Sequence, residues 1–370
     1  MAEIRVEHLQ KSFGEFVAVR DSSFTVRDGE FFCLLGPSGC GKTTTMRMIA
    51  GLELPTHGSI HLAGRDVTMQ RASQRDIAFV FQLFALYPHM KVRANIAFPL
   101  TSQGLPRAEV ATRVEEAARI LRITHLLDRP VAGLSSGDRQ RVALGRAIVR
   151  QPQAFMMDEP LGALDAEFRH VMCGELRALH DRLHATTVYV THDQLEAMAM
   201  ADTIAVMNHG AIEQLAPPQD IYERPATMFV ADFIGSPAMN FLPCTLPGGG
   251  LPRGAAEVRV DGAVVAMPPL AEDADSAELA LGVRPEHIEL AGEAPLRAQV
   301  FGVEYLGTTQ IVTLQLADGT RLKARVSSTV PARAGEHTGL RLRGKRLTLF
   351  RRGDGRALRS ALHESKAAHG

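Results

Sequence analysis

The sequence lacks several features that mark specialised classes of protein. It has no tryptophan, only four cysteines in 370 residues, and no excess charge of either sign, because 41 Lys and Arg balance 41 Asp and Glu. Nucleic-acid-binding proteins usually carry a strong positive charge, so neutrality argues against that class. Neutrality excludes neither a membrane partner nor an anionic ligand that is bound locally.

Long hydrophobic runs are also missing. No stretch of about 18 consecutive apolar residues occurs, and residues 1–14 show no apolar core behind a basic head, so we expect neither a membrane-spanning helix nor a secretion signal. The cysteines are Cys33, Cys40, Cys173 and Cys244. They form no CxxC pair and no zinc-ligand spacing, which favours a reducing, cytoplasmic setting over a disulfide framework.

The residues that are present have the composition of a globular protein, with 45% hydrophobic and 22% charged residues and enough chain for two or three domains. Residues 1–35 alternate apolar and polar positions around two glycine turns, which predicts an antiparallel β region feeding a buried central strand at 31–35. Helical periodicity is present at 107–127, after Ser135 and at 172–183, and strand-like runs occur at 187–191 and 203–207. These patterns together predict an α/β unit with a mostly parallel sheet.

The sequence changes in style at Gly235. Beyond it, clusters of Pro and Gly separate short alternating runs such as 257–260, which is typical of a small all-β barrel or sandwich. We therefore predict two domains, residues 1–235 and 236–370. The polar, Ala-rich tail from Gly353 onward is expected to be frayed.

The strongest motif is GPSGCGKTT at residues 36–44, which fits G-x-x-x-x-G-K-[ST]. Its glycines let backbone N–H groups converge on phosphate oxygens, Lys42 can reach terminal phosphates, and the Thr43 hydroxyl can bind Mg²⁺. Chance would produce the pattern in a chain of this size with a probability on the order of one per cent. A glycine-rich turn without a ligand is the simpler alternative, but the position between a predicted strand and a predicted helix favours a phosphate-binding loop.

A second motif is the apolar run 154–157 followed by Asp158 and Glu159. A buried strand that ends in two acids would place Asp158 toward Mg²⁺ and Glu159 where it can orient or deprotonate an attacking water. Such a pair alone is more often a solvated strand end or a helix cap. Together with the glycine loop it favours nucleotide hydrolysis.

Between these motifs lies LSSGDRQR, residues 134–141, where the sequence resembles the ATP-binding subunits of ATP-binding-cassette (ABC) transporters. The signature LSGGQ of that family is matched by Leu134, Ser135 and Gly137. Ser136 and Asp138 depart from it.

Other motifs follow in the order of the family. Residues 80–82, VFQ, resemble the Q-loop, residues 161–165, LGALD, the D-loop, and residues 191–193, THD, the switch region. Phe13 stands where the family has an aromatic residue that stacks on adenine. Singly, His192 would more often be a strand-end histidine and Phe13 a core residue, but the ordered set favours nucleotide-binding roles.

The resemblance implies ATP and Mg²⁺ as cofactors and assigns roles to particular residues. Catalytic roles fall on Glu159, His192, Gln82 and Lys42. Nucleotide contacts fall on Phe13, Gly36, Pro37, Ser38, Gly39, Cys40, Gly41, Lys42, Thr43, Thr44, Gln82, Ser135, Gly137 and Asp165. Metal contacts fall on Thr43, Gln82 and Asp158. For Cys40 the favoured interpretation is a small residue tolerated in the loop; the alternative is a thiol whose pKa is lowered by the helix N-terminus and whose alkylation blocks ATP binding.

The resemblance covers nearly the whole chain. Residues 84–90 and 95–100 resemble the coupling-groove segment of importers for sugars, polyols and glycerol phosphate, and residues 281–287 and 303–307 resemble the regulatory β domain of those importers. The implied fold is an α/β P-loop NTPase cassette with an antiparallel β subdomain and a helical subdomain at about 85–155. A C-terminal all-β OB-like (TOBE) barrel domain completes it.

In this family two cassettes meet head to tail, so that each ATP is held by the glycine loop of one and the signature of the other. The implied function is ATP hydrolysis at the cytoplasmic face of the inner (cell) membrane, with two permease subunits, an external solute-binding protein and a second cassette as partners. The implied solute is a sugar, polyol or glycerol phosphate, with iron or polyamine import as the alternative. Ser136 and Asp138 leave two interpretations open: tolerance within a homodimer, or a heterodimer whose partner has a regular signature.

Three other classes of function compete with import. Neutral charge and the coupling-groove segment disfavour a soluble cassette ATPase of DNA repair or translation. The signature and residues 191–193 disfavour a P-loop kinase or GTPase, and the acid pair disfavours a purely regulatory module. Basic residues at 341–352 alternate with leucines at strand period, which predicts a solvated strand face in preference to a site for anionic lipid or nucleic acid.

Overall fold

The computed structural model describes residues 2–81, 85–162, 164–245, 252–273 and 278–364. Internal contacts divide the chain into two compact units, Met1–Pro218 and Gln219–Gly370. The boundary between these units precedes Gly235, where the residue pattern of the sequence changes. The reason is that helix α8 (Met228–Phe233) packs with the second unit, with Ala231 and Phe350 in one small core cluster.

A ten-stranded sheet forms the centre of the first unit, in the order β5-β4-β1-β2-β10-β9-β3-β8-β7-β6. The strands are β1 Ile4–Phe13, β2 Phe16–Val26, β3 Phe31–Leu35, β4 His57–Leu62, β5 Arg65–Asp66, β6 Ile77–Val80, β7 Ala154–Asp158, β8 Thr186–Thr191, β9 Thr203–Asn208 and β10 Ala211–Ala216. Strands β9, β3, β8, β7 and β6 run parallel, whereas β1, β2, β4 and β5 pair antiparallel. The predicted antiparallel region and the buried strand at 31–35 are confirmed, and every residue of β3 is buried.

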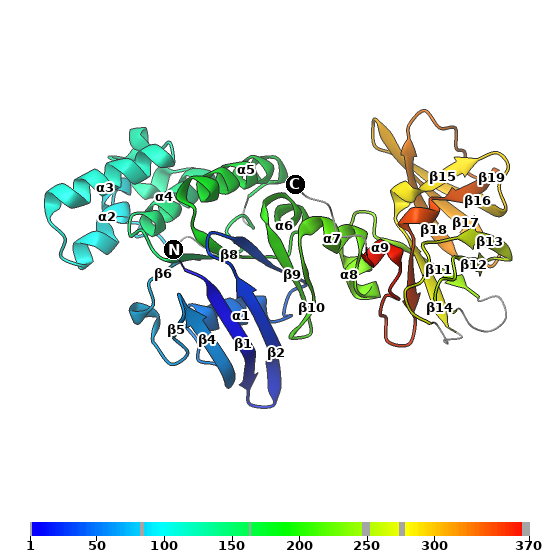
Figure 1. The fold of residues 1–370 in the computed structure, drawn as a ribbon. Coiled ribbons are helices and arrows are strands. Elements are labelled where there is room, and N and C mark those ends of the chain that lie inside the picture. Colours follow the sequence, from blue (N-terminus) through cyan, green and yellow to red (C-terminus); the bar gives the residue numbers. More distant parts are fainter. Residues whose placement is uncertain (1, 82–84, 163, 246–251, 274–277, 365–370) are drawn as a thin grey trace. The chain divides into compact units, whose positions relative to one another are not determined.

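The helices of the first unit are α1 Lys42–Ile49, α2 Val92–Ser102, α3 Arg107–Ile120, α4 Ser136–Ile148, α5 Ala166–Leu183 and α6 Gln194–Met200. Helices α2, α3 and α4 contact one another and form a helical layer (Figure 1). The helix expected over 107–127 ends at Ile120, because Arg122 takes a left-handed φ of 57° that an α-helix cannot continue through. In the described ranges, no helix is both long and apolar enough to cross a membrane.

Helix α1 is anchored in the core of the first unit. Met46 and Met48 are fully buried there together with Phe24 of β2, Leu34 of β3 and Met156 of β7. Burial of one such side chain stabilises the fold by roughly 1.5–3 kcal/mol. The start of α1, where the glycine loop ends, is thereby fixed against the parallel strands.

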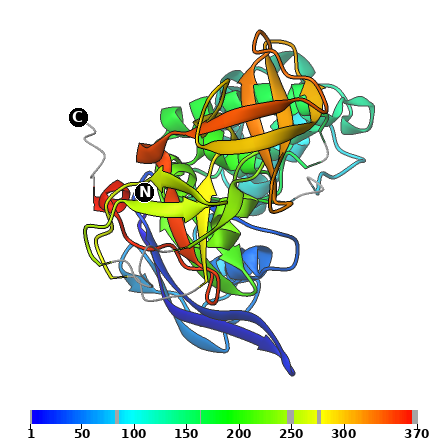
Figure 2. The same cartoon turned by 90° about the vertical axis from the view of Figure 1, so that its right-hand side faces the viewer.

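The second unit contains antiparallel sheets. Their orders are β11-β14-β20, β12-β13 and β15-β19-β16-β17-β18. The strands are β11 Asn240–Cys244, β12 Glu257–Val260, β13 Ala263–Ala266, β14 Leu279–Val283, β15 Ile288–Ala291, β16 Leu296–Tyr305, β17 Thr309–Leu316, β18 Arg321–Ser327, β19 His337–Leu342 and β20 Thr348–Arg351. Two further short helices are α7 Pro218–Glu223, which starts at the last residue of the first unit, and α9 Ala361–Glu364. Figure 2 faces this unit and shows its yellow, orange and red strands crossing in two directions. The expected all-β architecture is confirmed.

The tail does not fray where the sequence suggested. Leu358 is fully buried in the core of the second unit, and its N–H donates to the Leu349 carbonyl at 2.7 Å. Ser360 is also buried. The expectation of fraying was wrong for the residues up to 360, because the apolar side chain of Leu358 packs into the core and holds this otherwise polar segment against it.

Candidate functional site

The glycine loop joins the carboxyl end of β3 to the first turn of α1. A Cβ at Gly36 would lie 2.3 Å from the Met207 carbonyl oxygen, and a Cβ at Gly41, whose φ is 102°, would lie 2.6 Å from the Ala18 carbonyl oxygen. The loop is therefore pressed against the strands behind it, and only glycine fits at these two positions. Ser38 and Gly39 are exposed on the outer side of the loop.

Lys42 is folded into this loop. Its side chain is buried, and Nζ donates to the carbonyl oxygens of Gly36 and Pro37 at 2.8 Å each. The next two residues, Thr43 and Thr44, are half-buried in the first turn of α1. The ammonium group and the helix N-terminus thus stand together, the combination that binds phosphate in such loops.

Cys40 does not have the reactive environment that the sequence offered as the alternative interpretation. The residue is only 3% exposed, and burial raises the pKa of its thiol, while the nearby Lys42 acts in the opposite direction. Its Sγ lies under the loop, 2.8 Å from where a Cβ on Gly36 would be. The lowered pKa of that alternative is wrong because desolvation outweighs both the cation and the helix N-terminus.

Thr43 and Asp158 form the inner part of the acid site. The Thr43 hydroxyl donates to Asp158 Oδ1 at 3.0 Å. Burial raises the pKa of Asp158 and the charge of Glu159 adds to this effect, whereas the Thr43 hydrogen bond opposes it. A hydroxyl and a desolvated carboxylate beside a phosphate loop are the oxygen ligands that Mg²⁺ takes in nucleotide sites, so the residues present fit this ion. Gln82, also expected to bind Mg²⁺, lies outside the described residues.

Glu159 and His192 lie together at the ends of two adjacent parallel strands. Oε1 of Glu159 is 3.2 Å from Nδ1 of His192, whose side chain is about half exposed. The pairing of β7 with β8 explains this contact, because it sets Asp158 beside Val190. Glu159 itself has a left-handed φ of 42°, and its N–H donates to the Val190 carbonyl at 2.9 Å. A non-glycine residue in that region carries strain of about 1 kcal/mol or more, which the neighbouring strand holds in place.

The signature residues meet the start of α5. Ser135 is the N-cap of α4, and Asp165 is the N-cap of α5 and accepts from the Phe168 N–H at 2.9 Å. A Cβ at Gly137 would lie 2.3 Å from Cε1 of the Phe168 ring. Gly137 of the signature and Asp165 of the D-loop are thus brought together through Phe168.

Phe168 and Arg169 were not singled out from the sequence. Arg169 donates to Asp193 Oδ2 and to the Leu164 carbonyl, both at 2.9 Å, and so joins the D-loop segment to the switch segment. Spacing offered a signal for it, because Arg169 lies four residues after Asp165 and hence on the same face of α5.

Phe13 lies at the end of β1 and is 48% exposed. The Lys11 ammonium stands 4.7 Å from the centroid of its ring. The simpler interpretation of Phe13 as a core residue is wrong, and the ring offers an open aromatic surface.

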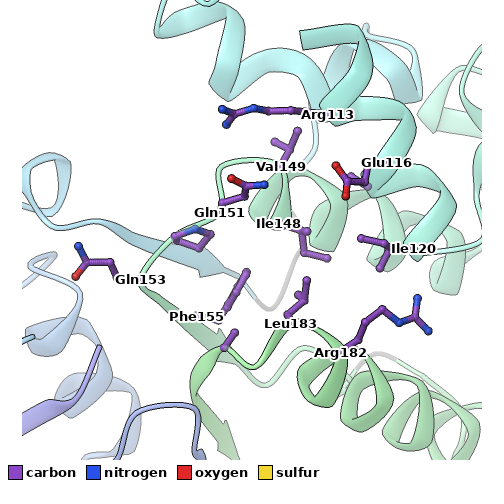
Figure 3. A pocket seen from close by; sticks show the side chains of 13 residues that line it. Arg113, Glu116, Ile120, Ile148, Val149, Gln151, Gln153, Phe155, Arg182 and Leu183 are labelled. Carbon is purple, nitrogen blue, oxygen red and sulfur yellow. The ribbon is translucent and has the colours of Figure 1, made fainter. Parts of the chain in front are cut away.

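A cavity of about 390 Å³ lies elsewhere in the first unit (Figure 3). Ile148, Phe155 and Leu183 project into it, with Glu116 and Arg182 among its charged lining residues. Phe155 stands near the amino end of β7, whereas Asp158 ends that strand. Of the predicted nucleotide-site residues that the structure describes, none lines this cavity.

Comparison with known proteins identifies the family. The family described as ABC transporter matches residues 19–162, the MalK OB fold domain matches 235–288, and the TOBE domain matches 281–350. The chain is 53% identical over 294 residues to the trehalose import ATP-binding protein SugC of Mycobacterium tuberculosis, which covers 78% of this chain and 73% of SugC. The chain is an ATP-binding subunit of the ABC transporter family.

Two further relatives match this ABC ATPase over almost its full length. The sn-glycerol-3-phosphate import ATP-binding protein UgpC of Cereibacter sphaeroides and the trehalose/maltose import ATP-binding protein MalK of Thermococcus litoralis are each 45% identical to it, over 97% of this chain and 100% of each relative. Among solved structures, cbiO1 of Clostridium perfringens, described as part of the ABC transporter complex cbiONQ, superposes with a TM-score of 0.56 and 26% identity over 59% of this chain and 89% of cbiO1. As an ABC ATPase, the chain binds ATP.

Proposed function

We propose that this ABC ATPase powers the import of a sugar, a polyol or a glycerol phosphate. The observation that carries the proposal is the combination of an ABC cassette with the MalK OB fold and TOBE domains in one chain. Relatives that match this chain are named for trehalose, maltose and sn-glycerol-3-phosphate. Iron or polyamine import is the alternative, which the names of these relatives do not support.

Residues of the glycine loop would hold the phosphates of ATP. Lys42 would give its ammonium to the terminal phosphates, and Thr43 and Asp158 would hold Mg²⁺, with Gln82 as a further ligand. The ion would offset phosphate charge during the reaction. The Thr43–Asp158 hydrogen bond and the raised pKa of Asp158 support this assignment, because a desolvated carboxylate gains from a nearby cation.

Glu159 would act as the base that takes a proton from the attacking water, and His192 would contact the γ-phosphate. Two features of Glu159 support its role: the strained backbone that aims its side chain, and the 3.2 Å contact with His192 that fixes the carboxylate. A positioned base of this kind contributes roughly 10²–10⁴-fold to a rate. The half-exposed imidazole leaves His192 accessible to the nucleotide.

The signature and D-loop residues Ser135, Gly137 and Asp165 would face the ATP of a second cassette, since the family arrangement is head to tail. The second cassette is either another copy of this chain or a paralogue with a regular signature. Phe13 would stack on the adenine.

A groove of about 340 Å³ would seat a permease helix at the cytoplasmic face of the membrane. It lies between β6, α2 and α4 and is lined by Phe81, Tyr87 and Phe98. Arg146 also lines this groove: its guanidinium lies 5.5 Å from the Tyr87 ring centroid and donates to the Ala85 carbonyl at 2.7 Å. Aromatic side chains together with the guanidinium groups of Arg146 and Arg150 suit an apolar helix that ends in an acidic or polar residue. Two permease subunits and an external solute-binding protein would complete the transporter.

The experiment that tests the proposal starts from the assembled complex. The chain is tagged, purified with its membrane partners and placed in proteoliposomes, and ATP hydrolysis is measured with trehalose, maltose, a polyol, sn-glycerol-3-phosphate, ferric iron or spermidine and the cognate binding protein. We expect a several-fold stimulation by one of the first four solutes. Stimulation by iron or spermidine alone, or purification without membrane subunits, would overturn the proposal.

A further inference from the structure

The hydroxyl group of the signature serine is already occupied within this chain. Ser135 Oγ donates to Asp138 Oδ2 at 2.8 Å and accepts from the Asp138 N–H at 3.1 Å. A hydroxyl has one hydrogen to give. Ser135 therefore cannot donate to a phosphate oxygen while it keeps its bond to Asp138.

Asp138 also brings a negative charge that Arg141 offsets only in part. Its Oδ1 lies 3.6 Å from Nη1 of Arg141, beyond hydrogen-bond distance. The same guanidinium makes three hydrogen bonds of 3.0–3.2 Å to the carboxylate of Glu175. Because Glu175 already pairs with Arg141, the group of Asp138, Arg141 and Glu175 carries one net negative charge.

The N-terminus of α4 favours one anion in its first turn, and Asp138 supplies it. An incoming triphosphate would need the same backbone amides and the same hydroxyl. The Asp138 carboxylate and the phosphate thus compete for the N-terminus of α4, and the repulsion between their negative charges further disfavours phosphate binding there.

We propose that Asp138 is a positioning residue that weakens the pairing of two copies of this chain around ATP. The inference rests on the proposed function, in which Ser135 faces the ATP of a second cassette. Asp138 holds the Ser135 hydroxyl toward its own helix and sets a carboxylate against the incoming triphosphate. The chain is thereby biased toward a partner with an uncharged signature, or toward pairing only when membrane subunits hold two copies together.

The expected effect follows from the charge and the symmetry. Removal of one partly exposed charge a few ångströms from another changes an equilibrium by about tenfold. A symmetric pair contains two signatures, so neutralising Asp138 should lower the dissociation constant of the ATP-bound pair by about a hundredfold.

The test uses the full-length chain with Glu159→Gln, which is expected to leave ATP uncleaved, and measures the monomer–dimer equilibrium by analytical ultracentrifugation with Mg²⁺ and ATP. Asp138→Asn and Asp138→Gln should each give the hundredfold tighter pairing. Asp138→Glu keeps the charge and should stay weak. Asp181→Asn is the matched control, because it removes the same charge at a position away from the signature. Asp181 lies near the C-terminal end of α5, where it pairs with Arg177 at 3.0 Å. This control should change the dissociation constant less than twofold.

Two further readouts separate this role from a merely structural one. The first is salt: raising it from 0.05 to 0.5 M should reduce the difference in dissociation constant between the chain with Asp138 and its Asp138→Asn variant, because salt screens charges near the surface. The second is the melting temperature, which shows whether each variant is folded. Pairing that is unchanged or weaker in both neutral variants, or equally strengthened in Asp138→Glu, overturns the proposal. If the monomer binds no fluorescent ATP analogue, the proposed function itself fails. This result distinguishes failure of the proposed function from failure of the proposal for Asp138.

Discussion

The Phe168 ring fills the space in which a side chain on Gly137 would begin. A Cβ at that position would lie 2.3 Å from Cε1 and 2.4 Å from Cζ of the ring. Because Asp165 caps the helix that carries Phe168, this contact ties the signature to the end of the D-loop. The two segments that are proposed to face a second cassette are therefore one packed surface.

Gly137→Ala should destabilise the first unit by about 1–3 kcal/mol, because the new methyl group overpacks the contact with Phe168. Phe168→Ala makes room for that methyl group. In a double-mutant cycle followed by calorimetry, the two substitutions together should cost at least about 1 kcal/mol less than the sum of the single effects. Additive effects would show that the ring does not constrain this position.

His192→Ala should lower the rate of ATP hydrolysis by about a hundredfold and change the affinity for ATP by only a few-fold. The imidazole contacts Glu159, which is the proposed base, so its loss affects the reacting arrangement more than the bound nucleotide. The measurement is kcat and KM for the assembled complex. His125→Ala, at an exposed histidine in the short 3-10 turn Thr124–Leu126, serves as the control. An unchanged kcat would remove His192 from the mechanism.

Arg75→Met should lower the melting temperature strongly, by the equivalent of about 3 kcal/mol. Arg75 is 2% exposed and donates to the carbonyls of Met48 and Ile49 at 2.6 Å and of Thr68 at 2.9 Å, so it caps the C-terminal end of α1. Methionine fills the space but leaves these buried acceptors without a donor, at about 1–3 kcal/mol each.

The matched control is Arg71→Met, because Arg71 is exposed and four residues away. It should melt within a degree or two of the parent chain. Equal melting temperatures for the two variants would mean that the buried hydrogen bonds of Arg75 contribute nothing.

Cys40 should react slowly with iodoacetamide at pH 7.5 in the folded chain, at least tenfold more slowly than in urea. Burial raises its thiol pKa, so the reactive thiolate is scarce at neutral pH and increases as pH rises toward that higher pKa. Mass spectrometry of the Cys40 peptide between pH 7 and pH 10 checks both points. Cys173, with a pKa raised by burial to about 11, is a second slow thiol in the same digest. Rapid labelling of Cys40 at pH 7.5 would restore the reactive thiol that the sequence suggested.

Local sequence patterns predicted the parts of the site that depend on short stretches of chain. The apolar run before Gly36 and the periodicity after Thr43 gave the strand, loop and helix, and the run before Asp158 gave the acid strand. These elements form because their apolar periodicity matches one secondary structure.

Contacts between distant segments were not predictable in the same way. The burial of Cys40, the ring of Phe168 against Gly137 and the four-carbonyl environment of Arg75 all depend on how separate elements pack. The order of strands decided the contact between Glu159 and His192, since both residues follow neighbouring parallel strands. Sequence periodicity identifies such strands but not their neighbours.

The most direct test of the proposed mechanism is phosphate release by the purified transporter complex that carries Glu159→Gln in this chain. We predict a loss of at least a hundredfold in the rate, with ATP still bound after gel filtration, because the variant keeps the phosphate loop and loses only the base. Hydrolysis at the parental rate would contradict the assignment of Glu159 and, with it, the proposed mechanism.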